Sequence, residues 1–185
     1  KIDTKIASRL MLEAGKKQIM AYHKFPEVEA LITQLHLDGA MPKLSTVRDD
    51  YFMPIFTNIG ANKSDRYMQT AINHDTQILT DGGVVGTLSI SRAHTFSEAT
   101  LSWIKKITQD YGFTKWNSDL EKVLGNAPNK TGLRIYLPEG SRILSTNGVL
   151  RDDVQFYYDP LQEVSYFYTE SIVNPGETKS ISIKY

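Results

Sequence analysis

In two neighbouring runs, apolar and β-branched residues recur on even numbers: Met68, Thr70, Ile72, Thr76 and Ile78 in the first, and Val84, Leu88 and Ile90 in the second. A period of two residues is typical of a β-strand with one buried face. Residues that face each other across an antiparallel pair share a face, so the register has to join even to even. A two-residue turn would place the two apolar sets on opposite faces. The pattern therefore predicts a three-residue loop, 80–82, that pairs Leu79 with Gly83 and has its glycine in the left-handed region.

Further segments alternate or are rich in β-branched and aromatic residues, as strands are. They are 50–56, 133–137, 142–145, 154–158, 164–173 and 178–185. Turn-forming residues at 138–141 and 174–177 separate some of them. Seven or so short strands at this spacing predict an antiparallel sandwich rather than a parallel sheet.

The N-terminal quarter has helical spacing. Ile6, Leu10, Ala14 and Tyr22 recur on one face, and Pro26 is expected to end that helix and to begin the next. Gly39 is the expected end of the second helix. Residues 1–45 are therefore predicted to form a helical hairpin packed on the main body.

The remainder, 46–185, is predicted to be an antiparallel β domain with a helical insertion at 97–125, which makes the fold class α+β. Ser97 is a good N-cap for the first inserted helix, and Gly112 is its expected end. Ser118 opens a capping box for a short second helix that Gly125 closes. Residues 126–130 are predicted to be a loop.

Composition limits the chemistry. Lys+Arg and Asp+Glu both number 21, so the chain has no overall field to attract nucleic acid. The absence of cysteine excludes disulfides, thiolate metal sites and cysteine nucleophiles. No apolar run approaches the roughly 20 residues that span a bilayer. The chain begins with Lys1, so we expect a piece of a longer polypeptide, with any membrane anchor outside it.

The polar loop 58–65 is the candidate ligand site. Its residues with binding potential are Asn58, Gly60, Asn62, Lys63 and Asp65. A glycine lets backbone amides approach a phosphate or sugar, and the lysine supplies charge. The spacing matches neither a P-loop nor an EF-hand. The alternative is a loop held by Asn and Asp side chains that bond their own backbone.

Of the four histidines, His74 and His94 lie on the predicted apolar face of the hairpin, opposite Leu88 and Met68. One interpretation is a titratable or metal-binding pair. The favoured interpretation is two partly buried, hydrogen-bonded side chains at a sheet end. We accordingly predict no metal site, no cofactor and no catalytic residue.

Two other patterns leave alternatives open. The doublets Asp49-Asp50 and Asp152-Asp153 suggest paired carboxylates, but adjacent strand residues point to opposite faces, so solvation at strand ends is favoured. The aromatic runs 156–158 and 166–168 suit core packing on one face, and a carbohydrate platform stays open for the other.

Several motifs occur together in a fixed order. They are Asp50-Tyr51, the loop 58–65, Arg92-Ala93-His94, the segment 133–141 and the segment 173–178. In this order they resemble the C-terminal portion of a bacterial family catalogued as domain of unknown function 4012, from about Lys17 onward apart from the helical insertion. The resemblance implies a membrane-anchored cell-envelope protein with an extracytoplasmic body, and no established activity.

Taken with the absence of a catalytic signature, this resemblance implies a non-catalytic extracytoplasmic module of a larger bacterial envelope protein, either structural or binding a surface polysaccharide or another envelope protein. The alternative is part of a cell-envelope enzyme that acts on glycan or lipid-linked phosphate.

Overall fold

The computed structural model describes residues 4–16, 19–40, 44, 51–149 and 153–185. The chain divides into two compact units, 1–44 and 45–185, and each is described by itself.

Unit 1 contains α1 (Thr4–Gly15) and α2 (Pro26–Gln34), with Pro26 at the start of α2 as expected. The prediction of one helix running to Pro26 is wrong, because α1 ends at Gly15 and residues 19–23 are not helical. In this segment Ala21 donates its N–H to the carbonyl of Leu37, 2.8 Å away. The segment is therefore hydrogen-bonded to the chain that follows α2 and not to a turn of its own helix.

The predicted end of α2 at Gly39 is also wrong. His36 takes the left-handed conformation at φ +55°, directly after the cap residue Leu35. The N–H of Leu37 then bonds the carbonyl of Ile32 at 3.0 Å, which satisfies a helix-end carbonyl as in a Schellman motif. His36 therefore provides the left-handed residue after the helix that the sequence pattern assigned to Gly39.

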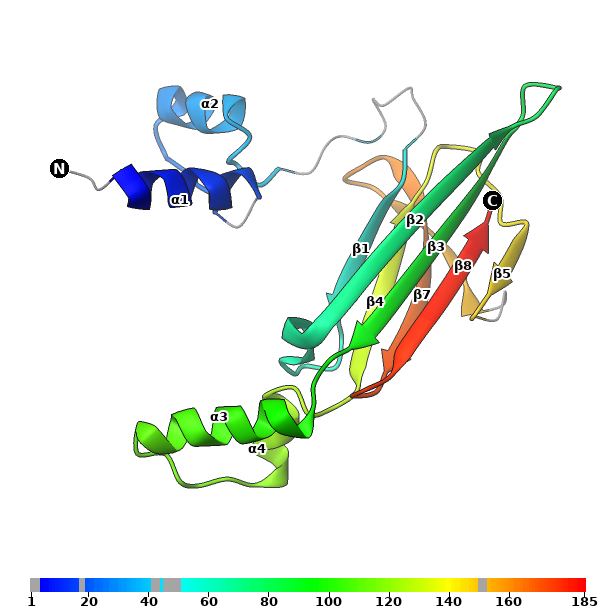
Figure 1. Cartoon of the computed structure of the whole chain (residues 1–185). Coiled ribbons are helices and arrows are strands. Elements are labelled where there is room, and N and C mark those ends of the chain that lie inside the picture. Colours follow the sequence, from blue (N-terminus) through cyan, green and yellow to red (C-terminus); the bar gives the residue numbers. More distant parts are fainter. Residues whose placement is uncertain (1–3, 17–18, 41–43, 45–50, 150–152) are drawn as a thin grey trace. The chain divides into compact units, whose positions relative to one another are not determined.

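Unit 2 consists of two four-stranded antiparallel sheets, together with short helices (Figure 1). One sheet has the order β1 (Met53–Asn58), β4 (Asn129–Tyr136), β7 (Val164–Val173), β6 (Gln155–Asp159). The other has the order β2 (Met68–Ile78), β3 (Val84–His94), β8 (Thr178–Lys184), β5 (Ser145–Asn147). The predicted α+β, sandwich-like fold is confirmed.

The β2–β3 hairpin has the predicted register. Ile78 pairs with Val84, and Leu79 donates its N–H to the carbonyl of Gly83 at 2.8 Å. Gly82 has φ +83°, the left-handed conformation that the three-residue loop requires. The even-to-even rule alone was therefore sufficient to choose between the two turns.

The core lies between the sheets and follows the alternation of β3. Leu88 and Ile90 are buried there with Leu133 and Ile135 of β4 and with apolar residues of β8. The buried face of β3 continues with two polar residues, Arg92 and His94. The same alternation on β2 is only partly buried, because β2 is an edge strand: Ile72 and Ile78 are exposed.

Some strand limits differ from the prediction because pairing between distant strands extends them. β4 begins at Asn129, inside the predicted loop 126–130, since Asn129 pairs with Val173. β5 lies at 145–147 rather than 142–145, because it is there that the chain pairs with β8.

The insertion forms α3 (Glu98–Asp110) and α4 (Ser118–Val123), which lie at the end of the sheets where β3 ends (Figure 1). Ser97 caps α3, and Gly112 follows it at φ +81°, both as predicted. The cap of α4 is Asn117, one residue before the predicted Ser118, because Asn117 Oδ1 accepts the N–H of Leu120 at 2.8 Å.

Leu88→Ala should lower the free energy of unfolding by about 2–5 kcal/mol, because Leu88 is 1% exposed in the inter-sheet core. Ile78→Ala, at an exposed position of the same hairpin, is the control and should cost less than about 1 kcal/mol. Urea unfolding of the full chain measures both. Equal losses would contradict the assignment of the core.

Candidate functional site

The loop 58–65 is closed by its own asparagines. The Asn58 side chain accepts the N–H of Gly60 at 2.8 Å and donates to the carbonyl of Asn62 at 3.0 Å. Asn62 in turn accepts the N–H of Ser64 at 2.9 Å. The amide of Gly60 is thus engaged within the loop, which is what the alternative interpretation of this segment describes.

A second set of hydrogen bonds fixes the loop to the start of β4. Ile59 donates its N–H to the carbonyl of Lys130 at 2.9 Å. The fully buried Asn129 donates its side-chain amide to Ser64 Oγ at 2.8 Å and to Asp65 Oδ1 at 2.7 Å. The loop is therefore attached to a central strand of one sheet.

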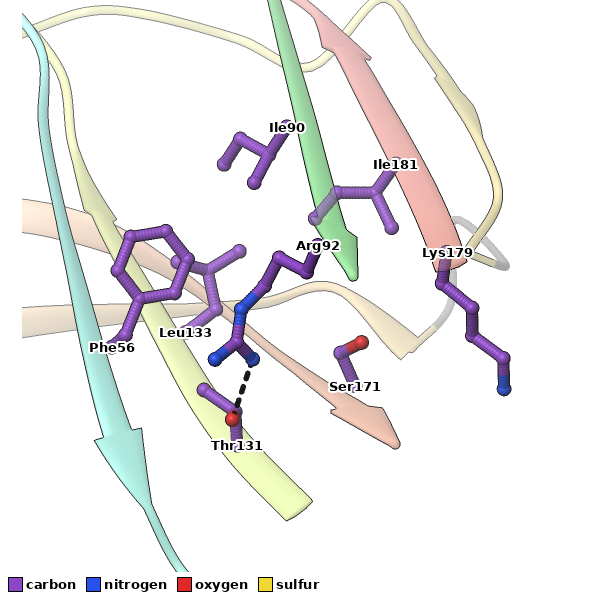
Figure 2. A pocket seen from close by; sticks show the side chains of 8 residues that line it. All are labelled: Phe56, Ile90, Arg92, Thr131, Leu133, Ser171, Lys179 and Ile181. Carbon is purple, nitrogen blue, oxygen red and sulfur yellow. Dashed lines mark hydrogen bonds between the residues drawn. The ribbon is translucent and has the colours of Figure 1, made fainter. Parts of the chain in front are cut away.

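The hydrogen bonds continue from Asn129 into the core. Thr131 Oγ1 donates to Asn129 Oδ1 at 2.6 Å, and Arg92 Nη1 donates to Thr131 Oγ1, also at 2.6 Å. Figure 2 shows the Arg92 guanidinium between the sheets, and its Cζ lies 5.0 Å from the centroid of the Phe56 ring. We call the connected side chains of Arg92, Thr131, Asn129, Ser64 and Asp65 the polar row.

The environment of Arg92 is costly for a cation. The side chain is 5% exposed, and its Nε has no hydrogen-bond partner among the described residues. Burial lowers the pKa of Arg92, while the negative charge of Asp65 acts in the opposite direction. The carboxylate of Asp65, at the far end of the polar row, therefore offsets part of the cost of burying the guanidinium.

Outside the loop lies a groove of about 590 Å³ between η2 (Ser64–Tyr67), α3 and α4. Ten residues line it: Asn62, Lys63, Asp65, Arg66, Tyr67, Trp103, Ile104, Ile107, Thr108 and Leu124. Of the five candidate residues, Asn62, Lys63 and Asp65 line the groove. Asn58 and Gly60 do not line it and instead shape the loop behind it.

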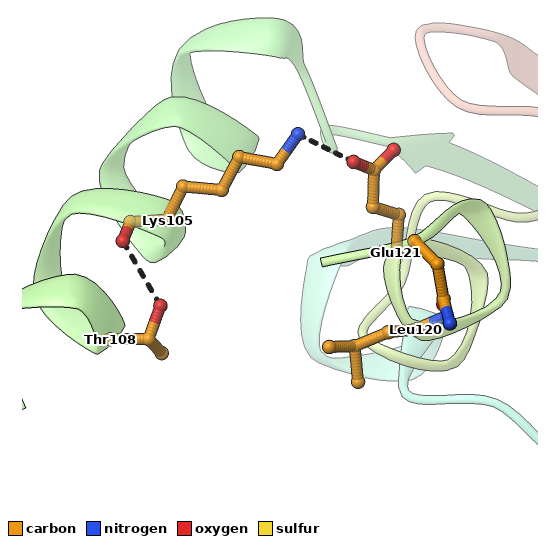
Figure 3. Close-up of polar contacts among 5 residues, drawn as sticks. Lys105, Thr108, Leu120 and Glu121 are labelled. Atoms are coloured by element: carbon orange, nitrogen blue, oxygen red, sulfur yellow. Dashed lines mark hydrogen bonds and ion pairs between the residues drawn. The ribbon is translucent and has the colours of Figure 1, made fainter. Parts of the chain in front are cut away.

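The helical wall of the groove is clamped by a polar contact. Lys105 of α3 forms an ion pair with Glu121 of α4 at 2.5 Å (Figure 3). On α3, Thr108 donates its hydroxyl to the carbonyls of Ile104 and Lys105. Trp103 of α3 also lines the groove and is 57% exposed, so its ring is accessible there.

The loop and the helical wall are also joined directly. Lys63 donates its N–H to the carbonyl of Val123 in α4 at 2.8 Å. Tyr67 packs edge-on against Phe96 with ring centroids 4.9 Å apart. Gly125, at φ +123°, lies so close to Tyr67 that a Cβ would be 2.4 Å from a ring carbon. Glycine is thus required here both for conformation and for space.

Two exposed cations belong to the groove. Neither Lys63 nor Arg66 forms an ion pair with a carboxylate in the part of the chain that the structure describes. The neighbouring carboxylate, Asp65, accepts a hydrogen bond from Asn129. The groove therefore combines positive charge with an exposed indole.

Sequence reasoning missed the contribution of the helices to this groove. It confined the candidate site to the loop 58–65, which leaves out Arg66, and considered the insertion 97–125 only for its two helices and their ends. The available signal was Trp103, a large aromatic residue four positions before Ile107 and therefore on its side of the helix.

Both hairpin histidines are hydrogen-bonded at the predicted register positions. His94 is 2% exposed, and its Nε2 lies 3.1 Å from the carbonyl of Ala127, while its Nδ1 accepts the N–H of Phe96 at 3.3 Å. These contacts assign a neutral ring with the proton on Nε2. Burial lowers the pKa of His94, the bond to Ala127 opposes this, and the charge of Arg92 lowers it further. His74 Nε2 lies 2.6 Å from the hydroxyl of Tyr185.

The remaining candidates do not converge on this groove. Asp49, Asp50 and Asp152 lie outside the described residues, and Asp153 is exposed. Phe167 packs in the core as expected for one face of the aromatic runs, with Phe156 beside it but 61% exposed.

Two searches of the described ranges gave negative results. No group of three or more His, Asp or Glu side chains is placed to hold a metal ion there. Within the same ranges no helix has the length and apolar character needed to cross a membrane.

Comparison with models of protein families, with curated proteins and with solved structures found no match. The resemblance described above therefore stays a prediction.

Asn129→Ala should lower the free energy of unfolding by about 1–3 kcal/mol, because it leaves buried partners in the polar row unsatisfied. Asn73→Ala is the control: this exposed residue also bonds a carboxylate, Asp75, but at the sheet edge, and its loss should cost less than about 0.5 kcal/mol. Chemical denaturation followed by circular dichroism compares them. Similar small losses would show that the polar row is not structurally important.

His94 should make stability depend on pH. Because its pKa is lower in the folded chain, the unfolded chain binds the proton first as the pH falls. The stability that the neutral His94 ring contributes to the folded chain is therefore complete above the ordinary histidine pKa of about 6.5 and is lost as the pH falls below it. His94→Gln keeps a donor for Ala127 but removes this titration, so its stability should fall less between pH 7.5 and 5.5. Identical slopes for the two proteins would contradict this.

Proposed function

We propose that this chain is a non-catalytic, extracytoplasmic binding module of a larger bacterial envelope protein, and that its groove binds a glycan. The observation that carries the proposal is the exposed Trp103 beside the polar loop, at a groove of about 590 Å³. That volume lies in the range of roughly 300–1,000 Å³ that small-molecule sites occupy.

The chemistry of the groove suits a sugar. An accessible aromatic ring offers a flat apolar surface with which the C–H face of a pyranose can stack. Around Trp103, the groove provides the amide of Asn62, the hydroxyl of Thr108 and the carboxylate of Asp65, which can bond sugar hydroxyls. Apolar contact is supplied by residues of α3 such as Ile107.

The walls of the groove are held in place before any ligand arrives. The loop is fixed by asparagine bonds and by Asn129, and α3 is clamped to α4 by Lys105 and Glu121. Binding to a preformed site avoids the entropic cost of ordering loops. The same contacts that stabilise unit 2 therefore favour binding.

The location in the envelope rests on the resemblance to domain of unknown function 4012, and a surface polysaccharide is a ligand consistent with it. The alternative is an enzyme acting on glycan or lipid-linked phosphate. Product analysis distinguishes the two, since a binding module leaves the bound saccharide unchanged and an enzyme converts it.

Trp103→Ala should weaken saccharide binding roughly tenfold or more, because stacking on an aromatic ring contributes about 1–3 kcal/mol in comparable sites. Tyr111→Ala is the control, since Tyr111 is 88% exposed at the end of α3 and does not line the groove. A microarray of neutral and acidic bacterial oligosaccharides, followed by calorimetry on the best binder, measures the effect. The proposal fails if no saccharide binds, or if the two variants bind alike.

A further inference from the structure

We infer that the ligand of the groove is an acidic saccharide, one whose sugar carries a carboxylate or a phosphate. This inference rests on the proposed function and adds the chemical class of the ligand. It is carried by the placement of two cations, Lys63 and Arg66, on one side of a single turn at the mouth of the groove.

The backbone brings the two cations together. Lys63 precedes η2, and the N–H of Arg66 bonds the carbonyl of Lys63 at 3.3 Å, an i to i+3 bond. In a 3₁₀ turn, residues three apart lie above one another on the same side. Both side chains line the groove and both are exposed, so their charges are directed to the same region.

Their closeness needs an explanation, because like charges on one side of a turn repel. The intervening carboxylate of Asp65 bonds Asn129 through Oδ1 and is the end of the polar row that leads to Arg92. The same carboxylate also stabilises the buried guanidinium of Arg92, so it is shared among three cations. An anion from outside would relieve the repulsion between Lys63 and Arg66.

The chemistry of the two cations fits an oxyanion. A guanidinium binds the two oxygens of a carboxylate or phosphate in a planar pair of hydrogen bonds, and an ammonium adds a compact point charge. Trp103 lines the same groove and supplies a surface for the sugar ring that carries the anion. The chain as a whole is neutral, so this preference is local.

The direct experiment compares two ligands that differ only in charge. Oligogalacturonate carries a carboxylate on each sugar, and its fully methyl-esterified form keeps the sugars but not the charges. The full chain should bind the acidic form at least about tenfold more tightly in calorimetry at low salt, and the preference should shrink as salt is added. A phosphorylated dextran oligosaccharide serves as a separate, phosphate-bearing probe, with the unphosphorylated oligosaccharide as its neutral counterpart.

Variants test which residues bind the anionic group of the saccharide. Lys63→Gln and Arg66→Gln should each weaken binding of the acidic form roughly tenfold while leaving binding of the ester unchanged. Lys106→Gln removes an exposed cation of α3 that does not line the groove, and should have no effect. Circular dichroism and melting curves check that each variant is folded.

The outcomes separate the two proposals. Tighter binding of a phosphorylated dextran oligosaccharide than of oligogalacturonate supports the inference and identifies a phosphate as the anion. Equal binding of the acidic and esterified forms, both lost in Trp103→Ala, overturns the inference and leaves the glycan-binding function standing. Binding of inorganic tripolyphosphate as tight as that of the acidic saccharides overturns the inference, because the site would then select charge alone. No binding of any saccharide overturns both.

Discussion

The structure of unit 2 depends on the polar row that begins at Arg92. Between the sheets, apolar residues of β3 and β4 pack against one another. Toward the end of β3, however, the buried face continues with the guanidinium of Arg92. Buried polar groups require partners, so β4 supplies Thr131 and then Asn129 at the same end. Asn129 in turn holds the loop through Ser64 and Asp65. A requirement of the core thereby determines the conformation of a surface loop.

This constraint explains why the loop and the helical insertion form one site. The loop is attached to the strand by Asn129 and to α4 by the backbone of Lys63, while α4 is attached to α3 by Glu121. The groove therefore has a wall on each side that is continuous with the sandwich. The ligand proposed above would meet groups whose positions were set by folding, which is the condition for selective binding without rearrangement.

Local patterns predicted much of this fold. The even-numbered alternation of β2 and β3 predicted both that these segments are strands and how they pair. Ser97 predicted the start of α3, because an N-cap bonds a backbone N–H only three residues further along the chain. Where the prediction failed, a contact distant in sequence decided the outcome: Asn129 became a strand residue because it pairs with Val173. The groove was only half predictable for the same reason. The loop contributes Lys63 from one segment, but Trp103 joins it only through the fold.

The most direct test of this account is native-state hydrogen exchange by NMR on the amides of Ile59 and Lys63, which bond β4 and α4 respectively. If the polar row makes the loop part of the core, these amides should open with free energies close to that of Leu88 in β3. If instead they exchange as fast as Gly82 at the exposed hairpin tip, the loop is independent of the core and the central claim is wrong.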